Sequence, residues 1–247
     1  MLRGIYTACA GMVAESRRQL TNINNLSNVG TQGYRQEEST MAALPPVQLR
    51  RTGPLPAAVG PLGLGVREAG TRIDLSPGAL KETNRKLDVA LGGPGFFVVQ
   101  TPQGERHTRL GSFQLLDDGT LATARGEPVL GEDGQIRLPS DQVEFAPDGS
   151  IYVAGERVAR LRIEDSPNPD ALTRIGDNLL ASTEGNMQAV PAEEANVLQG
   201  LLEQSNVDSV GAMTDLMAAL RAYGAAQRAL RMQDTTLARA IEEVGRT

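Results

Sequence analysis

The sequence predicts a mainly β central domain flanked by terminal α-helices that pair into a discontinuous coiled-coil domain. Three observations favour this class. Apolar residues recur every three or four positions near both termini, Asp-Gly turns punctuate the middle, and prolines and glycines crowd one intervening segment. We expect a helical domain of residues 1–35 and 205–247, a Pro/Gly-rich linker of residues 36–66 and a β domain of residues 67–204.

The first helix is expected over residues 2–28. Its pattern places on one face, the seam of a coiled coil, Leu2, Ile5, Cys9, Met12, Ser16, Gln19, Ile23 and Leu26. Asn28, Gly30 and Gly33 end the helix. Asparagine is a poor helix former, and four of them crowd the last turns, so this end should fray unless a neighbour holds it.

The linker of residues 36–66 contains five prolines and four glycines, which predict a loop or extended segment with little regular structure.

Residues 66–165 are expected to form strands. Leu87–Leu91 and Phe96–Gln100 flank a glycine-rich turn, which predicts a hairpin. Glycine follows Asp118, Asp133 and Asp148, and each pair suits a tight turn between successive hairpin strands. The alternation from Val158 to Ile163 predicts one further strand, and residues 164–195 are rich in turn signals.

The second helix should begin near Asn206 or Asp208, both good N-caps, and run to about Val244, roughly 55 Å at 1.5 Å per residue. Its stripe comprises Met213, Leu216, Leu220, Tyr223, Gln227, Leu230, Asp234, Leu237, Ile241 and Val244. A helix this long exceeds what its own domain can cover. We therefore expect the helices to pair with each other and with other copies, through Leu2, Ile5, Met12, Ile23, Leu26, Leu216, Leu220, Tyr223, Leu230, Leu237, Ile241 and Val244.

Composition excludes several classes of function. The formal net charge of −6 argues against a nucleic-acid partner, which needs clustered basic charge. A single cysteine and a single histidine exclude an internal disulfide framework and a multi-His metal cage. No apolar run approaches the roughly 20 residues of a membrane span, and the N-terminal segment lacks an apolar signal core. No cofactor or metal is expected.

No constellation makes a convincing catalytic site. His107 has no second histidine or cysteine nearby in sequence and is expected to be a solvated strand residue, while Cys9 is expected to be a small seam residue. The carboxylates lie in turn signals without the spacing of a calcium loop, and Gly93-x-Gly95 precedes a strand instead of a helix. We expect a structural protein and not an enzyme.

Four separate motifs resemble the bacterial flagellar rod and hook proteins. The N-terminal motif runs from Asn25 to Arg35 and includes Asn28, Val29, Thr31, Gly33 and Tyr34. The C-terminal motif comprises Ser205-Asn206-Val207-Asp208 and Leu220-Arg221-Ala222-Tyr223. Between them, two stretches resemble the β domain of the family: Leu87–Leu91 with Gly95–Val99, and Thr108–Phe113. The resemblance covers nearly the whole chain, in order.

The resemblance implies an axial subunit of the flagellar basal body, within the cell envelope and periplasmic space, with a hook/rod-type β fold. Such proteins leave the cell through the flagellar type III export apparatus without a cleaved signal and polymerise with other rod and hook subunits. The paired helices then line a hollow tube that transmits torque and forms the export channel.

The segment Met213–Met217 and the chain length resemble the proximal-rod type, FlgF, most closely. The distal-rod type, FlgG, is also similar to this chain at Arg221-Ala222-Tyr223 and Gly65-Val66. Two readings from other classes remain open: a secreted enzyme on a β scaffold, and a cytosolic coiled-coil adaptor that forms a stable dimer through both helices.

Overall fold

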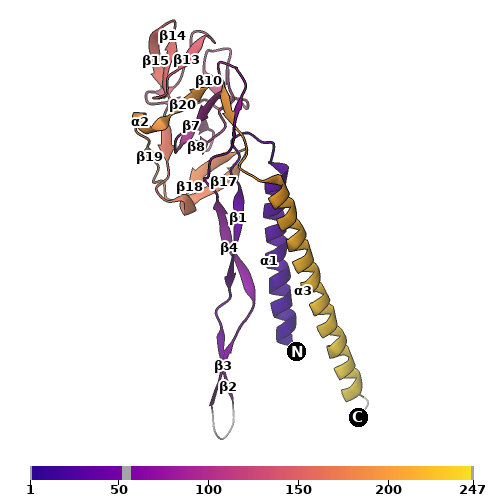
Figure 1. Ribbon diagram of the computed structural model, residues 1–247. Coiled ribbons are helices and arrows are strands. Elements are labelled where there is room, and N and C mark those ends of the chain that lie inside the picture. The colour runs from indigo at the N-terminus through magenta and orange to yellow at the C-terminus, as the bar shows by residue number, and fades with distance from the viewer. Residues whose placement is uncertain (1, 52–56, 246–247) are drawn as a thin grey trace. The chain divides into compact units, whose positions relative to one another are not determined.

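The computed structural model describes residues 2–51 and 57–245, and the chain divides into two compact units. The helical unit comprises residues 1–27, 37–71 and 208–247, and the β unit comprises residues 28–36 and 72–207. The result is a mainly β central region with one long helix from each end of the chain (Figure 1).

The helical unit contains α1 (Leu2–Ser27) and α3 (Ser209–Val244). The Asp208 side chain accepts hydrogen bonds from the backbone amides of Val210 and Gly211, both at 3.1 Å, and so caps α3. The predicted start of this helix is confirmed. Its 36 residues give a length of about 54 Å.

In this unit three strands, β1 (Glu37–Ala43), β2 (Val47–Arg51) and β3 (Ala57–Leu62), lie where little regular structure was expected, and a fourth, β4 (Val66–Ile73), begins where strands were expected. β1 pairs with β4, and β2 pairs antiparallel with β3. The prediction of an irregular segment at residues 36–66 is therefore wrong. Each strand of a two-stranded ribbon is an edge strand, where Pro61 and Gly60 can be accommodated. Pro54 and Pro56 lie outside the described residues.

The β unit is built around a six-stranded antiparallel sheet. Its order is β17 (Leu172–Gly176), β18 (Leu179–Ser182), β8 (Gly104–Thr108), β7 (Phe96–Thr101), β16 (Ile163–Asp165) and β19 (Gln188–Ala189). A three-stranded sheet contains β13 (Val143–Phe145), β14 (Ser150–Val153) and β15 (Glu156–Arg160). Two-stranded pairs join β9 (Phe113–Leu115) to β10 (Leu121–Thr123), β11 (Leu130–Gly131) to β12 (Gly134–Gln135), β6 (Val89–Leu91) to β20 (Val197–Gln199), and β5 (Leu80–Glu82) to β21 (Leu201–Glu203). The short helices are η1 (Pro169–Ala171) and α2 (Ala192–Ala195).

The three Asp-Gly turns lie where the sequence predicts them. They connect β9 to β10, β11 to β12 and β13 to β14, and all three pairs are antiparallel. The carboxylates of Asp118 and Asp148 each accept a hydrogen bond from the backbone amide two residues on, which stabilises the turn.

Two strand predictions are wrong. Leu87–Leu91 and Phe96–Gln100 do not form a hairpin, because β6 pairs with the distant β20 while β7 pairs with β8 and β16. Residues 158–163 do not form one strand, because β15 ends at Arg160 and β16 begins at Ile163.

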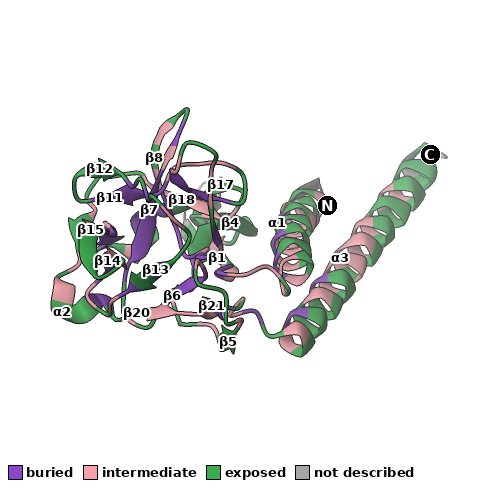
Figure 2. Cartoon of the chain, turned by 90° about the horizontal axis from the view of Figure 1, so that it is seen from above, coloured by how far each residue is buried: buried purple, intermediate pink, exposed green. Residues whose placement is uncertain are grey.

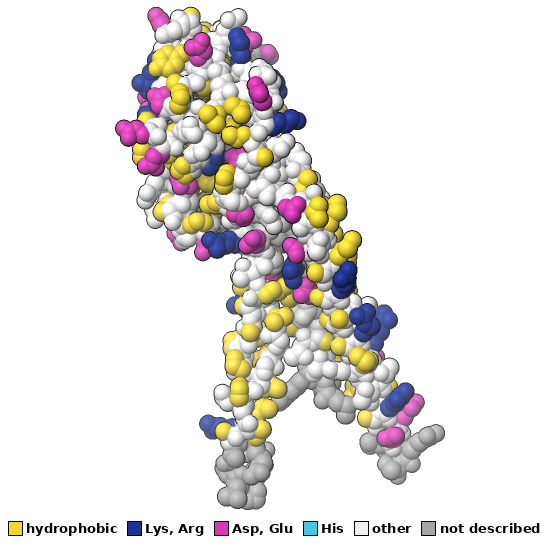
Figure 3. Space-filling view, viewed as in Figure 1, with side chains coloured by type: hydrophobic (Ala, Val, Ile, Leu, Met, Phe, Trp, Pro, Cys, Tyr) yellow, Lys and Arg dark blue, Asp and Glu magenta, His cyan; other side chains and the backbone are white. Residues whose placement is uncertain are grey.

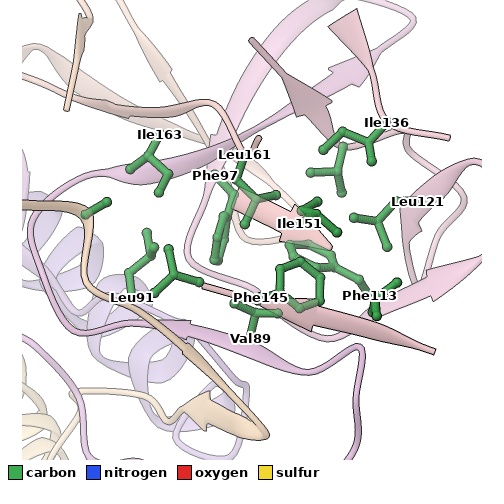
Figure 4. Packing of buried hydrophobic residues seen from close by; sticks show 14 of the residues in the cluster. Val89, Leu91, Phe97, Phe113, Leu121, Ile136, Phe145, Ile151, Leu161 and Ile163 are labelled. Atoms are coloured by element: carbon green, nitrogen blue, oxygen red, sulfur yellow. The ribbon is translucent and has the colours of Figure 1, made fainter. Parts of the chain in front are cut away.

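A large cluster of aliphatic and aromatic side chains packs inside the β unit (Figure 4), and a smaller cluster contains Ile73, Phe96, Leu172 and Leu180. The rings of Phe97 and Phe113 meet edge to face, with centroids 5.1 Å apart and planes at 78°. The surrounding side chains come from most of the small sheets, including Val89, Leu121, Ile136, Ile151 and Leu161. This core holds the short strand pairs together, since an isolated pair would be marginal in water.

Candidate functional site: the helix pair and the buried junction

The two long helices of the helical unit run antiparallel. The Gln19 side-chain amide donates to the Ala219 carbonyl oxygen at 3.3 Å, and a Cβ on Gly4 would lie 2.2 Å from the Gln233 side chain. Positions near the start of α1 therefore face the far part of α3, and positions near its end face the beginning of α3. Figure 1 shows both termini at the same end of the pair.

Half of the predicted α3 stripe faces inward. Leu216, Tyr223, Leu230 and Leu237 are half-buried, seven residues apart, whereas Leu220 and Ile241 are 53% and 64% exposed. Figure 2 shows the exposed character of α3 increasing toward its C-terminal end. The side chain of Val244 lies outside the described set.

The predicted α1 stripe is only partly covered. Ile5, Met12 and Leu26 are half-buried, while Ile23 and Cys9 are exposed; the side chain of Leu2 lies outside the described set. The most buried positions of α1 are instead Ala14, Thr21 and Asn25. The helix contacts β1 as well as α3, so small and polar residues fill a second face that apolar periodicity does not reveal.

Asn25 fixes the end of α1 to β1. Its side-chain amide donates to the Glu37 carbonyl oxygen at 2.7 Å, and its Oδ1 atom accepts from the Glu37 amide at 3.0 Å. The Asn25 side chain thus forms two hydrogen bonds with the backbone of Glu37, as a paired strand residue would. It supplies the neighbour that the asparagine-rich end of the helix was expected to need.

A groove opens between α1 and α3. Its volume is about 430 Å³, and it is lined by Cys9, Met12, Val13, Ser16, Arg17, Tyr223 and Leu230. Except for Arg17, the lining is apolar or weakly polar. Figure 3 shows further apolar side chains along the helical unit, between scattered charges.

A second concentration of motif residues lies inside the β unit, where a buried charge network joins segments far apart in sequence. We call Arg35, Arg109 and Glu203 the buried junction. The Glu203 carboxylate contacts the guanidinium of Arg35 at 2.7 Å and that of Arg109 at 3.3 Å, and all three side chains are at most 7% exposed. Its Oε1 atom also accepts from the Gly78 amide at 2.8 Å.

The two arginines are held by backbone oxygens as well. Arg109 donates to the carbonyl oxygens of Leu91 and Gly93, and Arg35 donates to that of Ser76. Burial lowers the pKa of Arg35, although the Glu203 carboxylate opposes the shift. Burial lowers the pKa of Arg109 to about 10, with Glu203 opposing and Arg35 adding to the shift. Both groups stay charged at neutral pH, and the Glu203 carboxylate offsets part of the charge of each, with Asp74 and Asp165 adding smaller effects.

Asn206 ties together the same region of the β unit. Its Oδ1 atom accepts from the Gln36 amide at 2.7 Å, and its side-chain nitrogen donates to the carbonyl oxygens of Asp74 and Ser76 at 3.1 Å. The Asn206 amide reaches the Tyr34 carbonyl oxygen at 3.3 Å. The segment that follows α1 and the segment that precedes α3 are therefore bonded to each other through this residue.

Gly33 is required by close approach and by conformation. Its φ is +63°, and a Cβ there would lie 2.6 Å from the carbonyl carbon of Arg109. The Gly33 amide donates to the Glu203 carbonyl oxygen at 2.8 Å. Any other residue would push this segment away from the buried junction.

The remaining motif residues are mainly structural. Tyr34 is buried beneath the guanidinium of Arg174, 4.2 Å from its ring centroid. The Thr31 hydroxyl donates to the side-chain oxygen of Asn28 at 3.0 Å and closes a turn. Val207 is buried and Val29 is half-buried, whereas Arg221 is exposed on α3.

His107 is not the solvated residue that the sequence predicted. It is 6% exposed, and its Nε2 atom lies 2.9 Å from the Glu164 carboxylate. Burial opposes ionisation of Glu164, but hydrogen bonds from His107 and Arg162 hold the pKa of the carboxyl below its usual range. The prediction failed because Glu164 comes from β16, which the sequence did not place beside β8.

Sequence reasoning quoted Arg35 and Arg109 within motifs but missed Glu203 and the buried junction. The sequence indicated these residues only as charges within hydrophobic stretches. Their pairing depends on the tertiary structure and could not be predicted. Among the described residues, no group of three or more His, Cys, Asp or Glu side chains could hold a metal ion. Within the same residues, no helix has the length and apolar character needed to cross a membrane.

Comparisons with known proteins agree with this architecture. The family described as "Flagellar basal body rod FlgEFG protein C-terminal" matches residues 198–243, and the "Flagellar hook protein FlgE/F/G D1 domain" matches residues 90–153. The first match covers most of α3, and the second covers much of the β unit.

Full-length relatives extend the match to nearly the whole chain. The chain is 31% identical to the flagellar basal-body rod protein FlgG of Borreliella burgdorferi, covering 96% of the chain and 97% of the relative. It is 30% identical to FlgF of Escherichia coli, with 97% of each covered, and 32% identical to FlgF of Caulobacter vibrioides, with 93% of each covered. The chain therefore belongs to the family of flagellar basal-body rod proteins.

Proposed function

We propose that this chain is a structural subunit of the bacterial flagellar rod that polymerises through its helical unit into a hollow drive shaft. The observation that carries the proposal is the apolar face that the helix pair leaves uncovered. On α1, Tyr6 and Leu20 are 74% and 64% exposed, and on α3 Met217 and Leu220 are 57% and 53% exposed.

Two of these residues, Leu20 and Leu220, lie on the same side of the pair. Each residue of an α-helix turns about 100° from the one before it. Leu20 follows Gln19, and Leu220 follows Ala219, which are the two residues that bond across the pair. In an antiparallel pair of right-handed helices, the residues that follow two facing residues point to the same side of the pair. Exposed leucines of both helices on one side of the pair favour a protein–protein interface there.

Torque transmission fits this arrangement. A shaft must resist slip, so its subunits need large shared interfaces rather than isolated contacts. In this proposal the helical unit forms the inner wall around an export channel and the β unit lies outside. The partners are other rod and hook subunits. The chain reaches the periplasmic part of the basal body through the flagellar type III export apparatus, without cleavage of a signal.

The proximal-rod type remains our preferred assignment, on the strength of the segment Met213–Met217 and the chain length. The distal-rod type is the alternative, supported by the 31% identity to a FlgG protein over 96% of the chain. Basal-body precursors arrested before distal-rod assembly distinguish the two types. Such precursors should contain this chain if it is a proximal subunit and should lack it if it is a distal one.

Deletion of the gene tests the proposal. Cells that lack the chain should build no hook and should not swim, and the wild-type gene supplied in trans should restore both. Basal bodies purified from the restored cells should contain the chain. Normal swimming of the deletion strain, or basal bodies free of the chain, would exclude a role in the rod.

A further inference from the structure

The helix α3 extends past the start of α1. Position 4 of α1 lies opposite Gln233, and α1 begins at Leu2, so residues beyond about 236 have no described α1 residue opposite them. We call residues 237–244 the overhang. Figure 1 shows the C-terminal end of α3 continuing beyond the N-terminal end of α1.

The overhang carries an apolar stripe that is covered only in part: Leu237 is half-buried. Leu237 and Ile241 are spaced by one helical turn, and Ile241 is 64% exposed. Glu242 and Glu243 beside them are exposed. With Arg239 on the opposite side, the overhang is a short amphipathic helical end that carries two acidic residues and one basic residue.

The groove defined above matches the overhang in length and in charge. Its α1 side runs from Cys9 to Ser16, two helical turns or about 10 Å, and the overhang presents two turns as well. The cation Arg17 lines the groove, and Arg231 is exposed one residue beyond Leu230. The cation that lines the groove complements the net negative charge of the overhang, where Glu242 and Glu243 outnumber Arg239.

The overhang cannot reach the groove of its own chain. Cys9 lies opposite position 228 of α3 by the register above, and Ile241 is thirteen residues further along a continuous helix, about 20 Å away. Only a second copy can place its overhang there. The contact joins two different surfaces, so it does not close on itself and generates an open helical polymer.

We propose that the overhang of one subunit docks in the α1–α3 groove of the next copy, and that this contact sets the axial repeat of the polymer. The inference rests on the proposed function, because it names the partner and the contact by which the rod grows. The exposed face at Leu20 and Leu220 is left for lateral neighbours.

The single cysteine of the chain lines the groove, and this allows a direct test. Ile241→Cys adds one thiol on the overhang stripe, and Leu237→Cys adds one a turn earlier. Disulfide formation requires Cα atoms within about 7 Å, so a link between either position and Cys9 forms only between chains. The matched control is Arg239→Cys, exposed on the opposite side of the overhang.

Each variant is expressed in the deletion strain, the cells are oxidised, and basal bodies are analysed by non-reducing electrophoresis and peptide mass spectrometry. At least one stripe variant should give a ladder of dimers and longer chains, linked between position 9 and the new thiol. The yield should exceed that of the Arg239→Cys control roughly tenfold, as expected for thiols held within bonding distance. Cys9→Ser in the same background should abolish the ladder.

Two outcomes separate this inference from the proposed function. If the variants swim but yield no mixed link, or only links between identical positions, the groove contact is wrong and the rod assignment stands. If the wild-type gene fails to restore swimming or the chain is absent from basal bodies, the rod assignment itself is wrong. A swimming strain whose oxidised rods contain the mixed ladder supports both.

Discussion

At the scale of single residues, the buried junction is the most sensitive point of the β unit. Glu203 is the only carboxylate that contacts Arg35 and Arg109 among the described residues, and removing its charge takes away the main compensation of two buried cations. The cost of an uncompensated buried charge exceeds the net value of the intact pair. Charge at this position is therefore a requirement for folding of the segments beside both helices.

Glu203→Gln keeps the shape of the side chain and removes the charge. We expect a loss of about 3–5 kcal/mol in the free energy of unfolding, typical of a broken buried ion pair. Urea unfolding followed by circular dichroism measures it. Glu184→Gln, at an exposed position, should change the free energy by less than about 0.5 kcal/mol. Equal stability of the two variants would show that the junction contributes nothing to the fold.

Glu164 predicts a pH dependence. Its pKa is lowered in the folded state by hydrogen bonds from His107 and Arg162, against the opposing effect of burial. A carboxyl whose folded pKa lies below its unfolded pKa stabilises the protein above the unfolded value, and this stability is lost as the pH falls through the folded value. The loss should begin near pH 4.5, the ordinary value of the group.

Glu164→Gln should reduce the loss of stability at acidic pH. The difference in melting temperature between wild type and variant should be present at pH 6 and shrink progressively below about pH 4.5. Calorimetry across this range measures it. Glu156→Gln, at an exposed position, serves as the control and should leave the loss of stability at acidic pH unchanged. A Glu164→Gln curve parallel to wild type at every pH would contradict the role of this carboxyl.

At the scale of elements, the helices and tight turns could be predicted from local sequence patterns. The two long helices follow from their apolar spacing and caps, and three hairpins follow from Asp-Gly pairs. The sequence could not predict that β6 pairs with β20 or that Glu203 meets Arg35, because both depend on segments brought together by the tertiary fold. The strands between residues 37 and 66 were missed because proline and glycine outweighed their short apolar runs.

Leu230 tests the helix pair as an element. It is half-buried, lines the α1–α3 groove and belongs to the helical unit. Leu230→Asp should leave export and the melting temperature of the β unit nearly unchanged but abolish rod assembly and swimming. Burial of one leucine is worth roughly 1.5–3 kcal/mol, and in the proposed polymer the contact would recur in every subunit. Thermal unfolding and a swimming assay are the measurements.

Arg228→Asp is the matched control, at an exposed position of the same helix. It introduces the same carboxylate and should permit assembly and swimming. A motile Leu230→Asp strain would argue against an interface at this position. A large drop in the melting temperature of the β unit would mean that α3 stabilises that unit instead.

At the scale of the whole molecule, the chain combines a well-filled β unit with a helical unit that is polar where its helices meet. Gln19 and Gln233 lie between the helices, and the Asn22 side-chain nitrogen and Gln233 Oε1 are buried without a hydrogen-bond partner among the described residues. Buried polar groups weaken a helix pair but fix its register. Such a pair is suited to remain unassembled as a monomer and to become ordered among neighbours.

Hydrogen exchange should therefore divide the molecule along its two units. In dilute monomer, amides of residues 2–27 should exchange quickly, because a helix pair with unsatisfied polar contacts opens at low free-energy cost. Amides of β7, β8 and β16, which belong to the six-stranded sheet and flank the core, should exchange slowly. In purified basal bodies the same α1 amides should become protected, because in the proposed rod neighbouring copies would cover the exposed side at Leu20 and Leu220. Slow exchange of α1 in the dilute monomer would show that the helical unit is stable by itself, and that assembly adds contacts without adding order.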